Sequence, residues 1–281
     1  MVEAVLSGDA SGTPSPLARA AERLGLEVHR AGLVREDRFA TFLETKEIDL
    51  LLNVHSLFVI RPDALRAPTI GSFNLHPGPL PRYAGLNAPS WAIYHGEHRH
   101  GTTVHWMSDA IDAGPIAYQA MFEIAPEDTG LSVAMKCVRL GIPLIATVVE
   151  AASGRAAIPR IEQRLDERTY FPPGPPQGGR VEWAAPARRI VDFVRAADYL
   201  PFASPWGHPR TSMGTQEVEM TKASSTGEPT NGMRPGTVGE IRGGGALVAA
   251  ADEWVLIARA RLGRTASPAG EILSPGMQLG T

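Results

Sequence analysis

The chain has 281 residues, of which 43% are hydrophobic and 20% are charged, and its formal net charge is -3. This length suits about two domains at roughly 150 residues each, and the composition lacks the low hydrophobicity and high charge of a disordered chain. The sequence has no run of about 18 consecutive apolar residues, so we expect no membrane span. The near balance of 27 basic and 30 acidic side chains gives no overall attraction to nucleic acid. Residues 1–7 lack the pattern of a signal peptide, so we expect a cytoplasmic protein that acts on small molecules.

Short apolar runs alternate with helical patterns over residues 1–150, which is typical of a parallel α/β sheet. The expected strands cover residues 2–6, 26–29, 48–54, 70–75, 102–107 and 115–122. The expected helices cover residues 16–24, 39–46, 89–95 and 129–152, with Gly25 ending the first and Thr129 capping the last. The single cysteine, Cys137, falls in the last helix, so we expect a buried and unreactive thiol.

The character of the sequence changes after residue 155. The Pro- and Gly-rich run over 170–179 cannot continue a helix or a central strand, so it predicts a linker. Residues 187–197 predict one more helix, and residues 211–234, rich in Ser, Thr, Gly and Pro, predict a mobile loop. Residues 236–279 give strand-like pieces that predict a small β domain. The expected division is a first domain over 1–155, a linker and helix over 156–205, and a C-terminal domain over 206–281.

Asn74 and His76 stand two residues apart at the end of a predicted strand, so their side chains leave the same face. Ligands of open α/β sheets bind beyond these strand ends, where an amide and an imidazole can jointly bind and deprotonate a substrate. The Pro-rich turn that follows would hold the backbone beneath a ligand at low entropic cost. From these residues alone, an asparagine that caps a turn beside an exposed histidine is an equally good interpretation.

Asp112 lies in a loop between two predicted strands, and small residues follow it that let a ligand approach the backbone. A carboxylate near His76 would orient its ring and raise its basicity. Taken by itself, however, Asp112 is explained more simply by an ordinary Asx turn.

Other histidines carry weaker signals. His95, His98 and His100 lie close together, but no carboxylate–histidine helix motif accompanies them, which favours a solvated helix-to-strand loop over a metal site. His105 and Trp106 alternate on a predicted strand, where core packing of Trp106 is favoured and a place for His105 in the site is the weaker interpretation.

Four short segments form a specific combination of motifs: residues 74–77, 80–83, 101–105 and 111–116. Together they resemble the 10-formyltetrahydrofolate-dependent formyltransferases, which act on methionyl-tRNA, glycinamide ribonucleotide, sugars and peptide-synthetase products. The resemblance covers most of residues 1–150. Residues 195–197 after a predicted helix and residues 235–238 at the start of a β region are similar to the OB-like C-terminal domain of the methionyl-tRNA enzymes. The resemblance implies an α/β fold with a Rossmann-like parallel sheet and a smaller C-terminal OB-like β domain.

The resemblance also implies that an amine attacks the formyl carbon of 10-formyltetrahydrofolate through a tetrahedral intermediate. Asn74, His76 and Asp112 would be catalytic: His76 as general base, Asn74 as hydrogen-bond donor to the developing oxyanion, and Asp112 as the group that positions His76. No metal is implied. The residues expected to contact the formyl donor are Leu57, Phe58, Val59, Ile60, Gly78, Pro79, Leu80, Pro81, Ser108, Asp109, Ala110 and Ile111.

Two features depart from the family pattern. Residues 1–6 align with what is normally the second strand, so the usual first strand and its helix are missing, which would leave the edges of neighbouring strands unpaired. We expect a mis-assigned start or a truncated sequence rather than a family variant. The loop over 7–14 has no Lys or Arg, whereas tRNA-specific enzymes carry a basic insertion there, because an acceptor stem needs phosphate neutralisation.

The predicted activity is therefore formyl transfer to an amine or hydroxylamine of a small or carrier-bound metabolite in secondary metabolism. Residues 83–91 support this because they resemble formyltransferases of peptide-synthetase and polyketide pathways. Transfer of the formyl group to methionyl-tRNA is the alternative activity, and a non-catalytic folate-binding protein is the alternative of another class. Neither tRNA nor a membrane is an expected partner.

Overall fold

The computed structural model describes residues 1–8 and 15–280. They divide into two compact units, which we call the first and second unit. The first unit comprises Met1–Ala84, Thr102–Ala120 and Leu140–Thr169; the second comprises Gly85–Gly101, Met121–Arg139 and Tyr170–Thr281.

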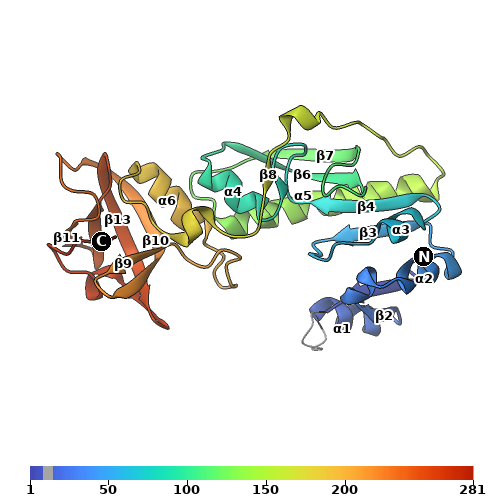
Figure 1. Cartoon of the computed structure of the whole chain (residues 1–281), viewed down its shortest axis with the longest axis horizontal. Helices are drawn as coiled ribbons and strands as arrows, with labels where there is room; N and C mark the ends of the chain where they lie inside the picture. The colour runs from blue at the N-terminus through green and yellow to red at the C-terminus, as the bar shows by residue number, and fades with distance from the viewer. Residues whose placement is uncertain (9–14, 281) are drawn as a thin grey trace. The chain divides into compact units, whose positions relative to one another are not determined.

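The strands of the α/β region agree with the predicted ones to within three residues at each end. They are β1 (Ala4–Ser7), β2 (Glu27–Arg30), β3 (Leu50–Val54), β4 (Gly71–His76), β6 (Arg99–Trp106) and β7 (Ile116–Glu123), with the short strands β5 (Ala84–Gly85) and β8 (Tyr170–Phe171). The helices are α1 (Pro16–Arg23), α2 (Arg38–Thr45), α3 (Pro62–Arg66), α4 (Ala88–Tyr94) and α5 (Gly130–Ser153), of which α3 was not predicted (Figure 1). The predicted α/β fold is confirmed.

The α/β sheet is divided into two pieces. β1 and β2 form a parallel pair, while β3, β4, β6 and β7 form a second sheet in that order, with β3 parallel and β6 antiparallel to β4. In the described part of the chain, no strand pairing joins β1 to β3. β3 is half-buried, because it is an edge strand of its sheet.

The alternation of side chains along β4 separates the core from the candidate site. Phe73 and Leu75 pack with Val104 of β6 and Val148 of α5 in a buried cluster. Asn74 and His76 therefore point to the opposite face, because successive side chains of a strand leave opposite sides of the sheet.

Helix α5 supports the core of the α/β region and contains the single cysteine. Thr129 Oγ1 accepts a hydrogen bond from the Ser132 amide at 3.3 Å, as expected of a capping residue. The Cys137 side chain is buried, as predicted, and burial raises the pKa of its thiol to about 12.

In the described part of the chain, α5 is also the one helix long and apolar enough to cross a membrane, by length and composition only. This is weak evidence for a membrane span, because core helices can share that length and composition. We expected no span because we searched the sequence for uninterrupted apolar runs, and polar residues such as Lys136 and Arg139 interrupt α5.

The C-terminal region is an antiparallel β domain covered by one helix, α6 (Ala187–Ala196), as predicted (Figure 1). Its strands are β9 (Arg210–Met213), β10 (Gln216–Pro229), β11 (Val238–Arg242), β12 (Gly245–Ala249), β13 (Glu253–Leu262) and β14 (Thr265–Pro268). The main path runs β11-β12-β13-β10-β9, and β14 pairs with β13. Ile190 and Val194 of α6 join Val218, Met220 and Ile257 of the strands in one apolar core.

The predicted mobile loop over 211–234 is wrong, because β9 and the 14-residue strand β10 occupy most of this segment. Val218 and Met220 enter the core, while the Ser- and Thr-rich second half is polar and mostly exposed. Ser224 and Ser225 still pair with Leu256 and Val255 of β13. A strand held by backbone pairing needs few apolar side chains, so composition alone favoured a loop.

Candidate active site

The structure brings Asn74, His76 and Asp112 together within the first unit. Asn74 and His76 lie at the end of β4, and Asp112 lies in the loop between β6 and β7. Asp112 Oδ1 is 3.4 Å from Asn74 Nδ2, and Asp112 Oδ2 is 3.5 Å from His76 Nδ1. His76 and Asp112 are buried, with 3% and 9% of their surface exposed. A half-buried amide therefore converges with a buried imidazole and a buried carboxylate.

The loop that carries Asp112 is held in place through its backbone conformation and backbone hydrogen bonds. Asp112 has φ 53°, in the left-handed region that aspartate tolerates better than most residues. A Cβ on Gly114 would lie 1.9 Å from the Trp106 carbonyl oxygen, so only glycine fits there. The Gln163 amide donates to the carbonyl oxygens of Asp112 and Gly114 at 3.0 and 2.6 Å. These contacts hold the carboxylate beside β4.

Contacts at both ring nitrogens define the state of His76. Nε2 lies 2.7 Å from the carbonyl oxygen of Tyr83, and because a carbonyl only accepts, Nε2 carries the hydrogen. Burial lowers the pKa of His76 below its ordinary value of 6.5, although the Asp112 carboxylate and the Tyr83 hydrogen bond oppose this shift. At neutral pH the ring is therefore uncharged, and the lone pair of Nδ1 is the basic site.

Gly78 occupies the space beside the contact between His76 and Tyr83. A Cβ at this position would lie 2.7 Å from His76 Nε2 and 2.8 Å from the Tyr83 carbonyl oxygen. We expect Gly78→Ala to displace the ring and to lower kcat by about 10- to 100-fold, the scale on which misplaced reacting groups act. Steady-state kinetics would measure this, with Gly32→Ala as control, because its Cβ would meet only Arg30 Nη1 at an ordinary 3.6 Å. Equal rates for both variants would contradict a role of Gly78 in placing His76.

Sequence reasoning missed Asn53 and gave His105 the weaker interpretation, yet both contact Asn74. Asn53 Nδ2 donates to Asn74 Oδ1 at 2.8 Å, and His105 Nε2 lies 3.1 Å from Asn74 Nδ2 and 3.4 Å from Asp112 Oδ1. The strand register explains this, because Asn53 of β3 and His105 of β6 flank Asn74 directly. The available signal was a lone amide in the otherwise apolar strand Leu50–Val54.

The residues predicted to contact the formyl donor differ in their placement. Leu57, Val59 and Ile111 expose 78%, 61% and 48% of their surface, so large apolar side chains are available to a flat aromatic ligand. Phe58 is half-buried beneath the guanidinium of Arg35.

The other residues predicted to contact the formyl donor are mostly buried or bonded to other parts of the protein. Three of them are buried, namely Gly78, Ile60 and Leu80, and two are half-buried, namely Pro79 and Pro81. Ile60 belongs to a core cluster, and the backbone N–H of Leu80 donates to Thr103 Oγ1. Ser108 Oγ donates to the Ala110 carbonyl oxygen, and Asp109 pairs with Arg66. If the formyl donor contacts Ile60 or Leu80, it must therefore do so mainly through their backbone atoms.

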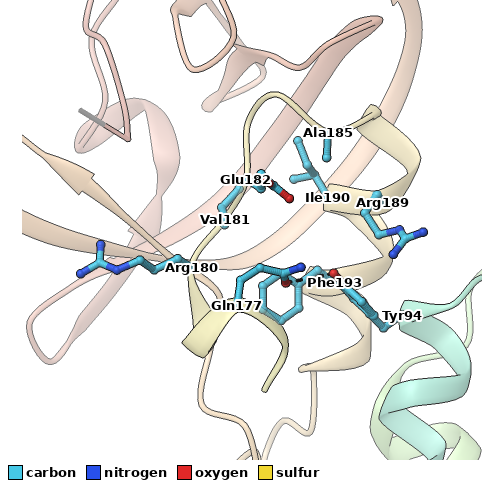
Figure 2. Close-up of a pocket in the computed structure, with 9 residues that line it drawn as sticks. All are labelled: Tyr94, Gln177, Arg180, Val181, Glu182, Ala185, Arg189, Ile190 and Phe193. Carbon is cyan, nitrogen blue, oxygen red and sulfur yellow. Dashed lines mark hydrogen bonds between the residues drawn. The ribbon is translucent and has the colours of Figure 1, made fainter. Parts of the chain in front are cut away.

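A small hollow in the second unit is unrelated to these residues (Figure 2). It lies between Tyr94 of α4 and the segment from Gln177 to Phe193, and Tyr94 donates a hydrogen bond to Gln177 Oε1. Its volume of about 10 Å³ suits a single water molecule rather than a substrate.

The histidine-rich segment is only partly a solvated loop. His95 and His98 are exposed, but His100 is fully buried in β6, edge-on to Phe122, because the strand begins earlier than predicted. Over residues 1–8 and 15–280, no group of three His, Cys, Asp or Glu side chains is placed to hold a metal ion.

Comparisons with known proteins agree with the fold and the predicted class. The formyl transferase model matches residues 9–149, and the formyl transferase C-terminal domain model matches residues 175–274. A methionyl-tRNA formyltransferase of Synechococcus sp. (strain JA-3-3Ab) is 30% identical over 273 residues, which cover 94% of this chain and 81% of that protein. The chain therefore belongs to the formyltransferase family, and the predicted class of enzyme is confirmed.

Other relatives show the range of this family. A methionyl-tRNA formyltransferase of Symbiobacterium thermophilum is 29% identical over 87% of this chain and 73% of its own length. The N-formyltransferase from Helicobacter canadensis, solved with folinic acid and dTDP-3-aminofucose, has a TM-score of 0.65 at 18% identity and covers 90% of this chain and 88% of that one. HypX from Aquifex aeolicus, solved with tetrahydrofolic acid, has a TM-score of 0.60 at 20% identity over 91% of this chain, which spans only 43% of the HypX chain. At these identities the two structures show a shared fold.

Proposed function

We propose that this protein transfers the formyl group of 10-formyltetrahydrofolate to an amine or hydroxylamine of a small or carrier-bound metabolite. The observation that carries the proposal is the convergence of half-buried Asn74 with buried His76 and Asp112. The folate compounds bound in the HypX and Helicobacter canadensis structures support the choice of donor. The exposed apolar residues Leu57, Val59 and Ile111 support it as well.

In this proposal His76 is the general base. Its Nδ1 lone pair accepts the proton of the amine as the new carbon–nitrogen bond forms, and the nearby Asp112 carboxylate stabilises the imidazolium that results. Once Nδ1 is protonated, the Asp112 carboxylate can accept a hydrogen bond from it, while the Tyr83 carbonyl holds Nε2 throughout.

Asn74 is the proposed oxyanion donor. Its Nδ2 donates to His105 at 3.1 Å and makes a longer contact of 3.4 Å with Asp112. The second N–H is therefore weakly engaged, and the developing oxyanion can take it over. Loss of one such donor costs about 100- to 1000-fold in kcat in other acyl-transfer enzymes.

The proposed acceptor follows from the sequence of the loop over 7–14, which has no Lys or Arg. Residues 9–14 of this loop lie outside the described residues. A small amine needs no phosphate neutralisation, whereas a tRNA acceptor stem does. Sugar N-formyltransferases of similar fold support a small acceptor.

Methionyl-tRNA is the second candidate acceptor, because three relatives that are similar in sequence over 80–94% of this chain are methionyl-tRNA formyltransferases. We propose secondary metabolism and the cytoplasm as the setting for the small-acceptor reaction. We also propose that the first domain ends at about residue 155 and that the C-terminal domain begins after about residue 205.

A formyl-transfer assay with separate acceptors distinguishes these candidates. The purified chain would be incubated with 10-formyltetrahydrofolate and either a panel of amines and hydroxylamines or methionyl-tRNA, and release of tetrahydrofolate would be followed. We expect turnover with at least one small acceptor. Turnover with methionyl-tRNA alone would favour the second candidate. A thermal shift with folinic acid but no turnover with any acceptor would favour a non-catalytic folate-binding protein.

A further inference from the structure

A continuous chain of hydrogen bonds crosses three neighbouring strands of the first unit at the candidate site. Asn53 of β3 donates from Nδ2 to Asn74 Oδ1 at 2.8 Å. Asn74 Nδ2 in turn lies 3.1 Å from His105 Nε2, and His105 Nδ1 lies 2.8 Å from the Trp106 carbonyl oxygen. The register places Asn53, Asn74 and His105 side by side.

When the His105 ring is neutral, its contact with Trp106 sets the direction of the hydrogen bonds from His105 to Asn53. A carbonyl only accepts, so His105 carries a hydrogen on Nδ1, and in the neutral ring Nε2 is then an acceptor. Asn74 must therefore present its N–H group to His105 and its oxygen to Asn53. The Asp112 carboxylate, also an acceptor, faces the same Nδ2 and requires the same orientation.

An asparagine side chain has two nearly isosteric orientations, which place either an N–H group or an oxygen at a given point. Only the orientation described here offers a donor on the side of Asp112. In the reverse orientation, Asn74 Oδ1 would face the Asp112 carboxylate and any oxyanion formed there. Asn53 supplies the donor that keeps Asn74 Oδ1 on the β3 side.

We infer that Asn53 is a positioning residue for formyl transfer, which acts by holding the Asn74 amide with its N–H group toward the reacting carbonyl. This inference rests on the proposed function, because it gives the Asn74 donor a reaction to serve. Asn53 does not touch the other two proposed catalytic side chains in any contact described here, so its effect on catalysis passes through Asn74.

Asn53→Leu removes the donor at nearly unchanged size, and we expect it to lower kcat by about 10-fold, part of the effect of losing an oxyanion donor outright. We expect the KM for 10-formyltetrahydrofolate to stay within about twofold, because Asn53 is not a predicted donor contact. Asn53→Gln, which keeps an amide donor, should recover part of the loss. Val54→Ala on the same strand is the control, since Val54 is exposed and takes no part in the chain of bonds.

A double-mutant cycle distinguishes positioning from a general packing effect. In an Asn74→Ala background, the added Asn53→Leu substitution should change kcat by less than about twofold, because its only route to the reaction is gone. A full 10-fold effect in that background, or wild-type kcat for Asn53→Leu in the natural background, would overturn the inference. If the wild-type chain releases no tetrahydrofolate with any acceptor, the proposed function fails instead, and the two failures are distinguishable.

Discussion

Replacing His76 by alanine should remove formyl transfer while leaving the binding of folinic acid intact. His76 is buried, its pKa is lowered by that burial, and its Nδ1 lies 3.5 Å from the Asp112 carboxylate. General base catalysis contributes about 100- to 10,000-fold to enzymatic rates, and we expect a loss of kcat within that range. Tetrahydrofolate release measures turnover, and a thermal shift with folinic acid measures binding of the donor analogue.

The matched control is His98→Ala, because His98 is an exposed histidine in the turn before β6. We expect it to retain wild-type kcat. Circular dichroism of both variants shows that each is folded, so that a loss of rate in His76→Ala is not a loss of structure. A folded His76→Ala protein with wild-type kcat would remove the basis of the proposed mechanism.

Asp112→Asn should lower kcat by about 100-fold or more, on the scale of acid–base catalysis, and should also move the pH–rate profile. Burial lowers the pKa of His76, and the Asp112 charge is the largest effect that opposes this shift. Neutralising Asp112 removes that opposition, so the pKa of His76 falls further. The base is active when unprotonated, so in the wild type the rate decreases as pH falls through a pKa below 6.5. In the variant this acid limb should lie at lower pH.

The control for Asp112→Asn is Asp37→Asn, which neutralises an exposed carboxylate whose partner is Arg61. Its profile of kcat against pH should overlay that of the wild type. An acid limb that stays in place in Asp112→Asn, or that moves to higher pH, would show that Asp112 does not act on the protonation of His76.

Much of the α/β fold could be predicted from the sequence, because its strands are short apolar runs and its helices have clear start and stop residues. Ser15 accepts a hydrogen bond from Ala18 at the start of α1, with Pro16 following it, and Gly25 has the positive φ that ends this helical segment. The strand β10 could not be predicted from composition, since backbone pairing with β9 and β13 stabilises its polar half.

The candidate site was predictable only where local motifs describe it. Asn74 and His76 share a strand, and the resemblance added Asp112, which the residues alone favoured as a simple turn. Asn53 and His105 reach Asn74 through the register of β3 and β6 against β4, which no local pattern contains. The Gly114 approach to the Trp106 carbonyl likewise depends on how two segments pack.

The hydrogen bond from His76 Nε2 to the Tyr83 carbonyl has a consequence for the order of events in the proposed reaction. With that nitrogen engaged, a single ring atom must both collect the proton from the entering amine and deliver it to the departing folate nitrogen. The ring cannot serve as a two-sided relay. The acceptor nitrogen and the folate nitrogen must therefore come within reach of Nδ1 one after the other. Acceptors too bulky to fit beside the folate at this atom should be poor substrates however tightly they bind.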